Sequence, residues 1–184
     1  PARALESCKT VGWPDDLIDK TRFVDDAMAV MQTGSVDVVV EATGNPAVGL
    51  THAREAIRNR LHIIMVNVEA DVLAGPLLAD EARQAGVVYS MAYGDQPALT
   101  CELVEWARAT GFDVVAAGRG TKYLPEYHSS TPDTVWDHYG LTPEEAAKGG
   151  MNPQMFNSFL DGTKSALEMA AISNASGLLA PRDG

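Results

Sequence analysis

The chain has 184 residues, with 25 acidic and 14 basic side chains, and its formal net charge is −11. Hydrophobic residues make up 46% and charged residues 21%, which is a globular composition and excludes a disordered or collagen-like chain. The length suits one domain, or one domain with part of another. The acidic balance, without any basic cluster, argues against a nucleic-acid surface and against an anionic membrane surface.

Several sequence signals of other protein classes are missing. No apolar run approaches the roughly 20 residues that cross a bilayer, and the N-terminal residues lack the apolar region of a signal peptide. Cys8 and Cys101 are far apart and predict neither a disulfide framework nor a metal site. The four histidines form no zinc-binding pattern. These observations favour a reducing, cytoplasmic setting.

The first 35 residues predict short helices. Residues 1–12 have the pattern of the end of a helix closed by Gly12, and a turn is expected at residues 13–16. Residues 24–31 predict another short helix, in which Asp25 or Asp26 lies in the first turn, where a carboxylate interacts favourably with the helix dipole.

From residue 36 the chain alternates between β-branched runs and helical segments, two of which begin with Pro and end with Gly. This alternation predicts parallel strands joined by right-handed helical crossovers. The fold class is therefore α/β, with a doubly wound parallel sheet. The predicted strands are 36–41, 62–68, 87–92 and 112–117, and the predicted helices are 47–60, 76–86 and 97–111.

The amino-acid composition of the sequence changes after Gly120. Residues 121–156 are rich in Pro, Gly, Tyr, His and Thr, and an irregular segment of this length in a compact protein is typical of a functional region or of disorder. Its aromatic residues argue against disorder. A short helix is expected at residues 143–148, and a long helix is expected at residues 154–176, ended by Gly177.

Polar or Gly-bearing segments follow all four predicted strands. In a parallel sheet the carboxyl ends of the strands share one edge, which is where such folds bind ligands. Each segment alone fits a helix cap or turn equally well, but four on one edge favour a binding site. The Gly in the first segment also lets the backbone approach a flat ring or a ribose. The segments are residues 41–45, 67–71, 93–96 and 118–123.

A polar stripe lies on the predicted C-terminal helix. Asn157, Asp161, Lys164 and Glu168 follow a spacing of i, i+4, i+7 and i+11, which places them on one helical face. One interpretation is a solvated face with ion pairs worth about 0.2–0.5 kcal/mol each. The alternative, favoured by Gly162 within the helix and by neighbouring Met and Ala residues, is a packed face that binds a carbonyl or polyol and moves a proton.

Two further chemical hypotheses concern the same region. Lys122, after the fourth predicted strand, is a second candidate for proton transfer or carbonyl binding. Asp161 or Glu168 could contribute to a site for a divalent cation such as Mg²⁺ or Mn²⁺, because hard cations take oxygen ligands.

The signature of a dinucleotide site is absent from the sequence. No Gly-x-Gly-x-x-Gly turn follows the first predicted strand, and no ribose-selecting residue follows the second. The chain also does not begin with Met. We interpret it as a fragment that lacks about one βαβ unit of a larger enzyme.

Six segments of the sequence match the pattern of one enzyme family. They are DVVVEATGNP (37–46), MVNVEADVLAGP (65–76), YGDQPAL (93–99), GRGTKYLP (118–125), STPDTVW (130–136) and GMNPQMFNSFLDGTK (150–164). Together they resemble the homoserine-dehydrogenase-like NAD(P)-dependent oxidoreductases that carry a C-terminal SAF domain. Within that family they look like the 1-deoxy-D-xylulose 5-phosphate reductoisomerase-like branch, whose activity belongs to isoprenoid precursor synthesis.

The resemblance implies a domain plan and an activity. Residues 1–118 would be part of an NAD(P)-binding Rossmann domain, and residues 119–184 would begin a catalytic α/β domain. The implied reaction is the NADPH-dependent isomerisation and reduction of 1-deoxy-D-xylulose 5-phosphate, assisted by a divalent cation, in a homodimer. The chain departs from the family in lacking the Gly-rich turn and the SAF domain.

The resemblance also implies roles for individual residues. The cofactor, NADP(H) or NAD(H), would lie near the first two strand ends, and the substrate would lie near the last helix. Arg119 and Lys122 would be partners of a substrate phosphate. The expected cofactor-binding residues are Glu41, Ala42, Thr43, Gly44, Asn67 and Glu69; the expected catalytic residues are Lys122, Asp161 and Lys164; the expected substrate-binding residues are Asp95, Arg119, Asn157 and Glu168.

Two other hypotheses remain open from the sequence. The same Asp and Lys pattern suits a homoserine dehydrogenase or another hydroxy-acid dehydrogenase. The missing phosphate-binding turn suits a non-catalytic module or fragment of a larger enzyme.

Overall fold

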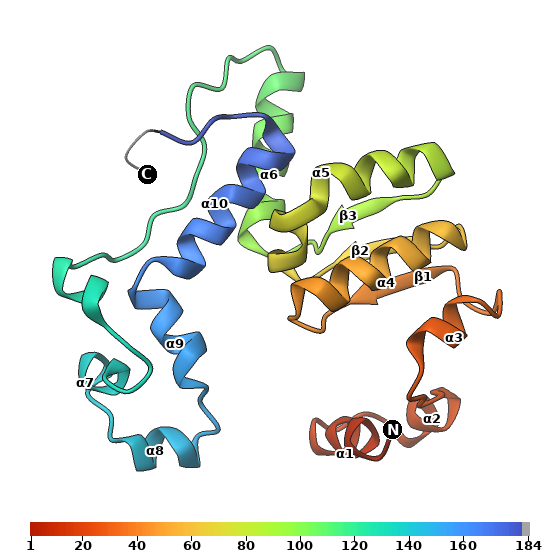
Figure 1. Ribbon diagram of the computed structural model, residues 1–184, viewed down its shortest axis with the longest axis horizontal. Coiled ribbons are helices and arrows are strands. Elements are labelled where there is room, and N and C mark those ends of the chain that lie inside the picture. The colour runs from red at the N-terminus through yellow and green to blue at the C-terminus, as the bar shows by residue number, and fades with distance from the viewer. Residues whose placement is uncertain (182–184) are drawn as a thin grey trace.

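A computed structural model describes residues 1–181 of the chain, and its centre is a small parallel sheet (Figure 1). The strands are β1 (Val38–Glu41), β2 (His62–Met65) and β3 (Tyr89–Met91). They lie in the order β1-β2-β3, with Val38 beside His62 and Ile63 beside Tyr89. The predicted α/β class is therefore confirmed, and the fold is consistent with part of a Rossmann-like sheet.

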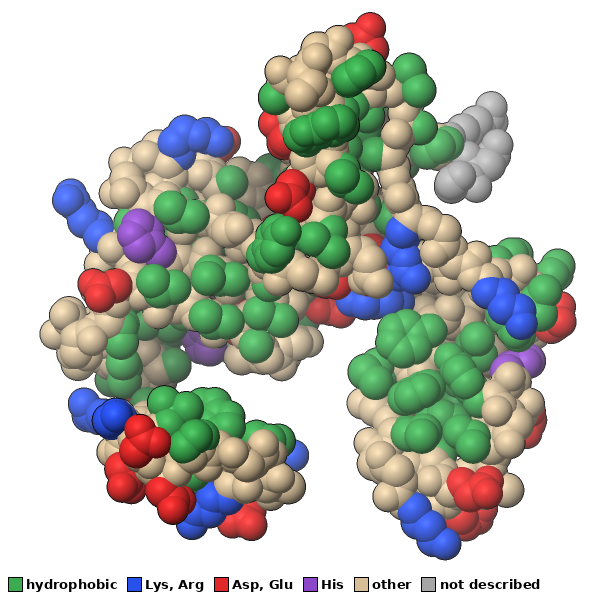
Figure 2. All heavy atoms as spheres, turned by 180° about the vertical axis from the view of Figure 1, so that it is seen from behind, with side chains coloured by type: hydrophobic (Ala, Val, Ile, Leu, Met, Phe, Trp, Pro, Cys, Tyr) green, Lys and Arg blue, Asp and Glu red, His purple; other side chains and the backbone are tan. Residues whose placement is uncertain are grey.

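Two crossover helices, α4 (Pro46–Arg58) and α5 (Val68–Ala85), cover the sheet. Small buried residues on α4 allow close packing, and larger apolar residues of the strands fill the space between the layers. Seen from behind, hydrophobic side chains lie across the sheet region, and Val38, Val40 and Val88 are among the exposed ones (Figure 2). The core consists of Met31, Ala53, Ala56, Ile57, Leu61, Ile63, Met65, Ala70, Leu78 and Ala82.

Helix α5 begins eight residues earlier than the sequence predicted. Asn67 caps it, because its side-chain oxygen accepts from the Ala70 amide at 3.2 Å. Pro76, which we expected in the first turn, lies inside the helix. A proline has no N–H to donate to the carbonyl four residues before it, and the freed Val72 carbonyl accepts instead from Asn174 Nδ2 at 3.1 Å.

The fourth predicted strand is wrong. Helix α6 (Gln96–Ala109) is followed by an irregular segment within the described residues, and Val115 in that segment is 93% exposed. The β-branched run 112–117 fits a pleated, half-buried surface, but strand formation needs a partner edge. Here the segment leaves the sheet region instead of pairing with β3.

The predicted long C-terminal helix is two helices, α9 (Pro153–Leu160) and α10 (Thr163–Ser176). Gly162 separates them with a φ of 88°, a conformation that favours glycine. Helix α10 packs on α5 and α6, and Arg108 of α6 donates to the Ser176 carbonyl at 3.0 Å. Asn157 and Asp161 therefore belong to α9 and its end, whereas Lys164 and Glu168 belong to α10.

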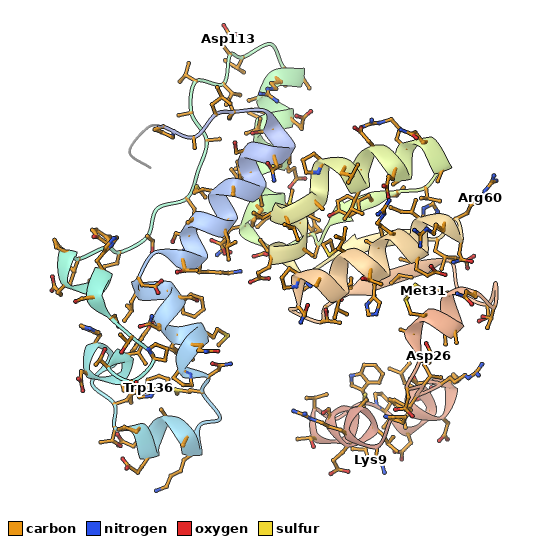
Figure 3. The ribbon with its side chains drawn as sticks, viewed as in Figure 1. Lys9, Asp26, Met31, Arg60, Asp113 and Trp136 are labelled. Carbon is orange, nitrogen blue, oxygen red and sulfur yellow. The ribbon has the colours of Figure 1, made fainter. Side chains whose placement is uncertain are left out.

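Residues 125–160 form a separate lobe with an aromatic core (Figures 1 and 3). Its elements are η1 (Pro125–Ser129), α7 (Val135–Tyr139), α8 (Pro143–Lys148) and α9. Trp136 is buried and its ring lies 5.3 Å from that of Phe156. This ordered packing agrees with the expectation that the aromatic residues oppose disorder, and α8 confirms the short helix predicted at 143–148.

The first two N-terminal helices lie away from the sheet (Figure 1). Helix α1 (Ala2–Thr10) occupies the segment that we predicted as a helix end, but α2 (Asp15–Lys20) begins inside the expected turn. Helix α3 (Ala27–Met31) is capped by Asp26, and its Met31 packs into the core of the sheet (Figure 3). The N-terminal region is thus tied to the sheet through α3.

No helix within residues 1–181 is both long enough and apolar enough to cross a membrane.

Candidate active site

The turn between β1 and α4 lies at the carboxyl edge of the sheet. Ala42, Thr43 and Gly44 are exposed there, as a ligand-contacting turn requires. Gly44 has a φ of 67°, and no other atom lies within 4 Å of the position that a Cβ would take. The backbone of this turn is therefore open to a flat group.

Glu41 lies beneath this turn, and it is buried. Its Oε1 accepts from the Thr43 amide at 3.2 Å and lies 3.5 Å from His52 Nδ1. Burial raises the pKa of Glu41, but the neighbouring Thr43, Asn67 and His52 groups outweigh burial and bring the pKa below its usual value. Its Oε2 is buried and has no hydrogen-bond partner within residues 1–181. Glu41 therefore supports the turn from within and does not face solvent.

Asn67, after β2, holds the same turn in place. Its Nδ2 donates to the Asn45 carbonyl at 2.9 Å, while its Oδ1 caps α5. Asn67 is 2% exposed, so it connects the ends of β1 and β2 from inside the protein. Glu69 lies in the first turn of α5 and is half-buried.

The second group of predicted site residues is built around Glu168 of α10, which is 1% exposed. Arg119 Nη1 donates to Glu168 Oε2, and Lys164 Nζ lies 3.6 Å from Glu168 Oε1. The side chains of Arg119 and Lys164 are 25% and 26% exposed, so both keep partial contact with solvent. We call Arg119, Lys164 and Glu168 the cationic cluster.

Arg119 comes from the irregular segment after α6, and a glycine brings it against α10. A Cβ on Gly118 would lie 3.2 Å from Met169 Sδ, so a side chain there would crowd this contact. The sequence placed Arg119 at a strand end, whereas the structure places it in a segment that packs on α10. The two residues of the Arg119–Glu168 pair are 49 positions apart.

The start of α6 joins the cationic cluster to the edge of the sheet. Asp95 caps α6, with Oδ1 accepting from the Gln96 amide at 2.9 Å. In the orientation that satisfies its neighbours, the Gln96 side-chain amide donates to Asp95 Oδ1 and to Glu168 Oε1, at 3.0 and 3.2 Å. Sequence reasoning marked this strand end but missed Gln96, because a glutamine beside a capping Asp carries no signal of its own.

The four residues of the predicted polar stripe do not share one helical face. They form two pairs, Asn157 with Asp161 and Lys164 with Glu168. Asn157 Nδ2 donates to Asp161 Oδ2 at 2.9 Å, and Asp161 Oδ1 accepts from the Thr163 amide at 2.9 Å. Both Asp161 oxygens are thus engaged in shaping the α9–α10 junction. The Oδ1 of Asn157 is buried and has no hydrogen-bond partner in the described part of the chain.

Lys122 is exposed, and no ion pair or hydrogen bond within residues 1–181 joins it to Asp161, Lys164 or Glu168. Across the same described residues, no three His, Cys, Asp or Glu side chains come together as a metal-ligand set.

Comparison with known proteins gives one family match. Residues 94–184 match the family described as "Oxidoreductase DRL, catalytic domain". A search of curated proteins finds no match. The matched region begins just before α6 and contains Gln96 and the whole cationic cluster. The segment from residue 94 onward is therefore similar to an oxidoreductase catalytic domain, which supports enzyme status and a general oxidoreductase function.

Proposed function

We propose that the chain contributes to an NAD(P)H-dependent oxidoreductase whose substrate is a small carbonyl or hydroxyl compound with an anionic group. The observation that carries this proposal is the cationic cluster within the region that matches an oxidoreductase catalytic domain. Buried Glu168 holds two cations that keep partial contact with solvent, beside the start of α6.

The turn Ala42–Gly44 fits a nicotinamide cofactor. It is exposed at the carboxyl edge of the sheet, and the absence of a side chain at Gly44 leaves room for close approach. A bound NAD(P)H supplies the hydride. Glu41 and Asn67 hold the backbone of the turn, and Glu69 lies in the first turn of α5.

Arg119 and Lys164 have different roles in this proposal. The guanidinium of Arg119 keeps donors beyond its contact with Glu168, and their planar arrangement suits a phosphate or carboxylate. The compact ammonium of Lys164 donates a hydrogen bond to a substrate oxygen, where it stabilises negative charge that develops on that oxygen. Asp161 shapes the junction that places Lys164, and we assign it a positioning role.

The leading substrate is 1-deoxy-D-xylulose 5-phosphate, because its phosphate and carbonyl match the two cations of the cluster. Homoserine is the second candidate, since it carries a carboxylate and a hydroxyl for the same two groups. NADPH consumption with the first substrate and NADP⁺ reduction with the second separate the two reactions. Activity with neither, together with no NADPH binding detected by fluorescence, would favour the module hypothesis.

Lys164→Ala tests the catalytic role. We expect turnover to fall roughly 100-fold or more, as for loss of a positioned acid or hydrogen-bond donor. The free energy of unfolding should fall by only about 1 kcal/mol, because Arg119 still compensates Glu168. Lys148→Ala, at the exposed end of α8, is the matched control and should leave both quantities unchanged. Parallel losses of rate and stability in Lys164→Ala would contradict the role.

A further inference from the structure

A cavity of about 380 Å³ lies between α5, β3 and α10, apart from the candidate active site. Asp71 and Tyr89 contribute its polar surface deep in the protein, and Asp80 and Arg83 line it at the surface. Its apolar lining comes from Pro76, Ala79, Met91 and Ala175. Its volume far exceeds the roughly 30 Å³ that one water molecule occupies. The cavity therefore has room for a small organic molecule.

Asp71 is a buried carboxylate without a cation. It is 5% exposed, and among the described residues its one side-chain hydrogen bond comes from Tyr89, whose hydroxyl lies 2.7 Å from Oδ1. Within residues 1–181 no Lys, Arg or His forms an ion pair with it. Burial raises the pKa of Asp71, and burial together with Asp71 raises the pKa of Tyr89. A buried negative charge of this kind is costly unless something positive meets it.

Helix α5 is shaped around this carboxylate. A Cβ on Gly75 would lie 2.5 Å from Asp71 Oδ1, so glycine is needed for the observed position of the side chain. Gly75 and Pro76 are consecutive inside the helix, where both residue types are unfavourable relative to Ala. The segment thus carries two unfavourable helix residues at the wall of the cavity.

The charges of the cavity favour a cation over an anion. Asp71 and Asp80 bring two negative charges, and Arg83, paired with Asp80, brings one positive charge. A metal ion requires several oxygen ligands, and this cavity has one buried carboxylate. A primary ammonium group needs fewer fixed partners, and the apolar lining suits a short hydrocarbon stem.

We propose that the cavity formed by Asp71, Pro76, Tyr89, Met91 and Ala175 binds a small primary amine, with its ammonium against Asp71 and its stem against the apolar residues. An occupant of this site contacts both α5 and α10. Because α10 also carries Lys164 and Glu168, the site is suited to sense or stabilise the position of that helix.

Titration of the full 184-residue chain with butylammonium chloride, followed by amide chemical shifts, tests the proposal. We expect saturable shifts at Gly75, Tyr89 and Ala175. Butanol, which has a similar stem without the charge, should bind at least about tenfold more weakly, since a hydrogen bond to a charged group contributes about 1.5–3 kcal/mol. Equal binding of butanol, or no saturable shifts with butylammonium, would overturn the proposal.

Asp71→Asn separates the charge from the shape of the site. The variant keeps an oxygen that can accept from Tyr89, and butylammonium should bind it at least about tenfold more weakly. Asp80→Asn, at the mouth, is the matched control and should retain most of the binding, because Asp80 is 61% exposed and already paired with Arg83. Unchanged binding to Asp71→Asn contradicts the proposal. Neither readout depends on hydride transfer, so the result is independent of the proposed enzyme activity.

Discussion

The two buried carboxylates near α10, Glu168 and Asp71, are compensated in opposite ways. Glu168 is held by Arg119 and Lys164 and has a side-chain amide beside it, whereas Asp71 has one phenol. In the first arrangement, the buried carboxylate of Glu168 holds two cations that keep partial contact with solvent. In the second arrangement, no cation within residues 1–181 pairs with Asp71, so its carboxylate can interact with a positively charged ligand. Our two proposals therefore assign opposite ligands to similarly buried carboxylates, an anion at the cationic cluster and a cation at the cavity between α5, β3 and α10.

The largest effect should come from Glu168→Gln. Removing one charge of a buried ion pair leaves the opposite charges uncompensated and typically costs about 3–5 kcal/mol. Because Arg119 and Lys164 keep partial contact with solvent, we expect a loss near the lower end of this range, about 3 kcal/mol. Urea unfolding measures it. A loss below about 1 kcal/mol would show that Glu168 does not hold the cluster together.

The second effect should come from Gly75→Ala. Its Cβ would overlap Asp71 Oδ1, and overpacking of this kind costs about 1–3 kcal/mol. In an Asp71→Ala background the obstacle is gone, and the same substitution should become neutral or stabilise α5 by up to about 1 kcal/mol. A double-mutant cycle on unfolding free energies measures this coupling. Equal effects in both backgrounds would mean that Gly75 is not required by Asp71.

The smallest effect should come from Asp71→Asn, and it should depend on pH. Because the pKa of Asp71 is raised in the folded state, the unfolded chain loses this proton first as pH rises. The wild type therefore loses stability relative to the variant from about the ordinary Asp pKa upward, until the folded carboxyl has also ionised. Thermal unfolding should show similar melting temperatures for both proteins near pH 3 and a higher one for the variant at pH 7. A gap that is constant with pH contradicts this account.

Much of the sheet could be predicted because its signals are local. The runs at β1 and β2 are mostly β-branched or apolar, two valines precede β3, and Pro, Asn and Gly mark the ends of the intervening helices. Where a local signal had two meanings, the prediction failed. Pro76 looked like a first-turn proline, but Asn67 caps α5 nine residues earlier, and the proline is accommodated by a contact from α10.

The candidate site was predicted in part. Arg119, Lys164 and Glu168 were all singled out, but their contacts were not, because the pairing of residues 119 and 168 depends on how the irregular segment packs on α10. The single helical face was wrong, since a left-handed glycine at 162 changes the direction of the chain. The pairing of Asp71 with Tyr89 had no sequence signal, because neither residue type indicates a buried partner 18 positions away.

The proline in α5 has a consequence for geometry at a distance. By releasing the Val72 carbonyl, Pro76 gives α10 one defined acceptor, and Asn174 occupies it. Asn174 lies ten residues after Lys164 on the same helix, which corresponds to about 15 Å along the axis. If α10 slid by one turn, Lys164 would move by about 5.4 Å, but Asn174 would lose its acceptor. The missing N–H of Pro76 in α5 thus favours one position of α10 along its own axis. The position of α10 in turn determines where the ammonium group of Lys164 lies.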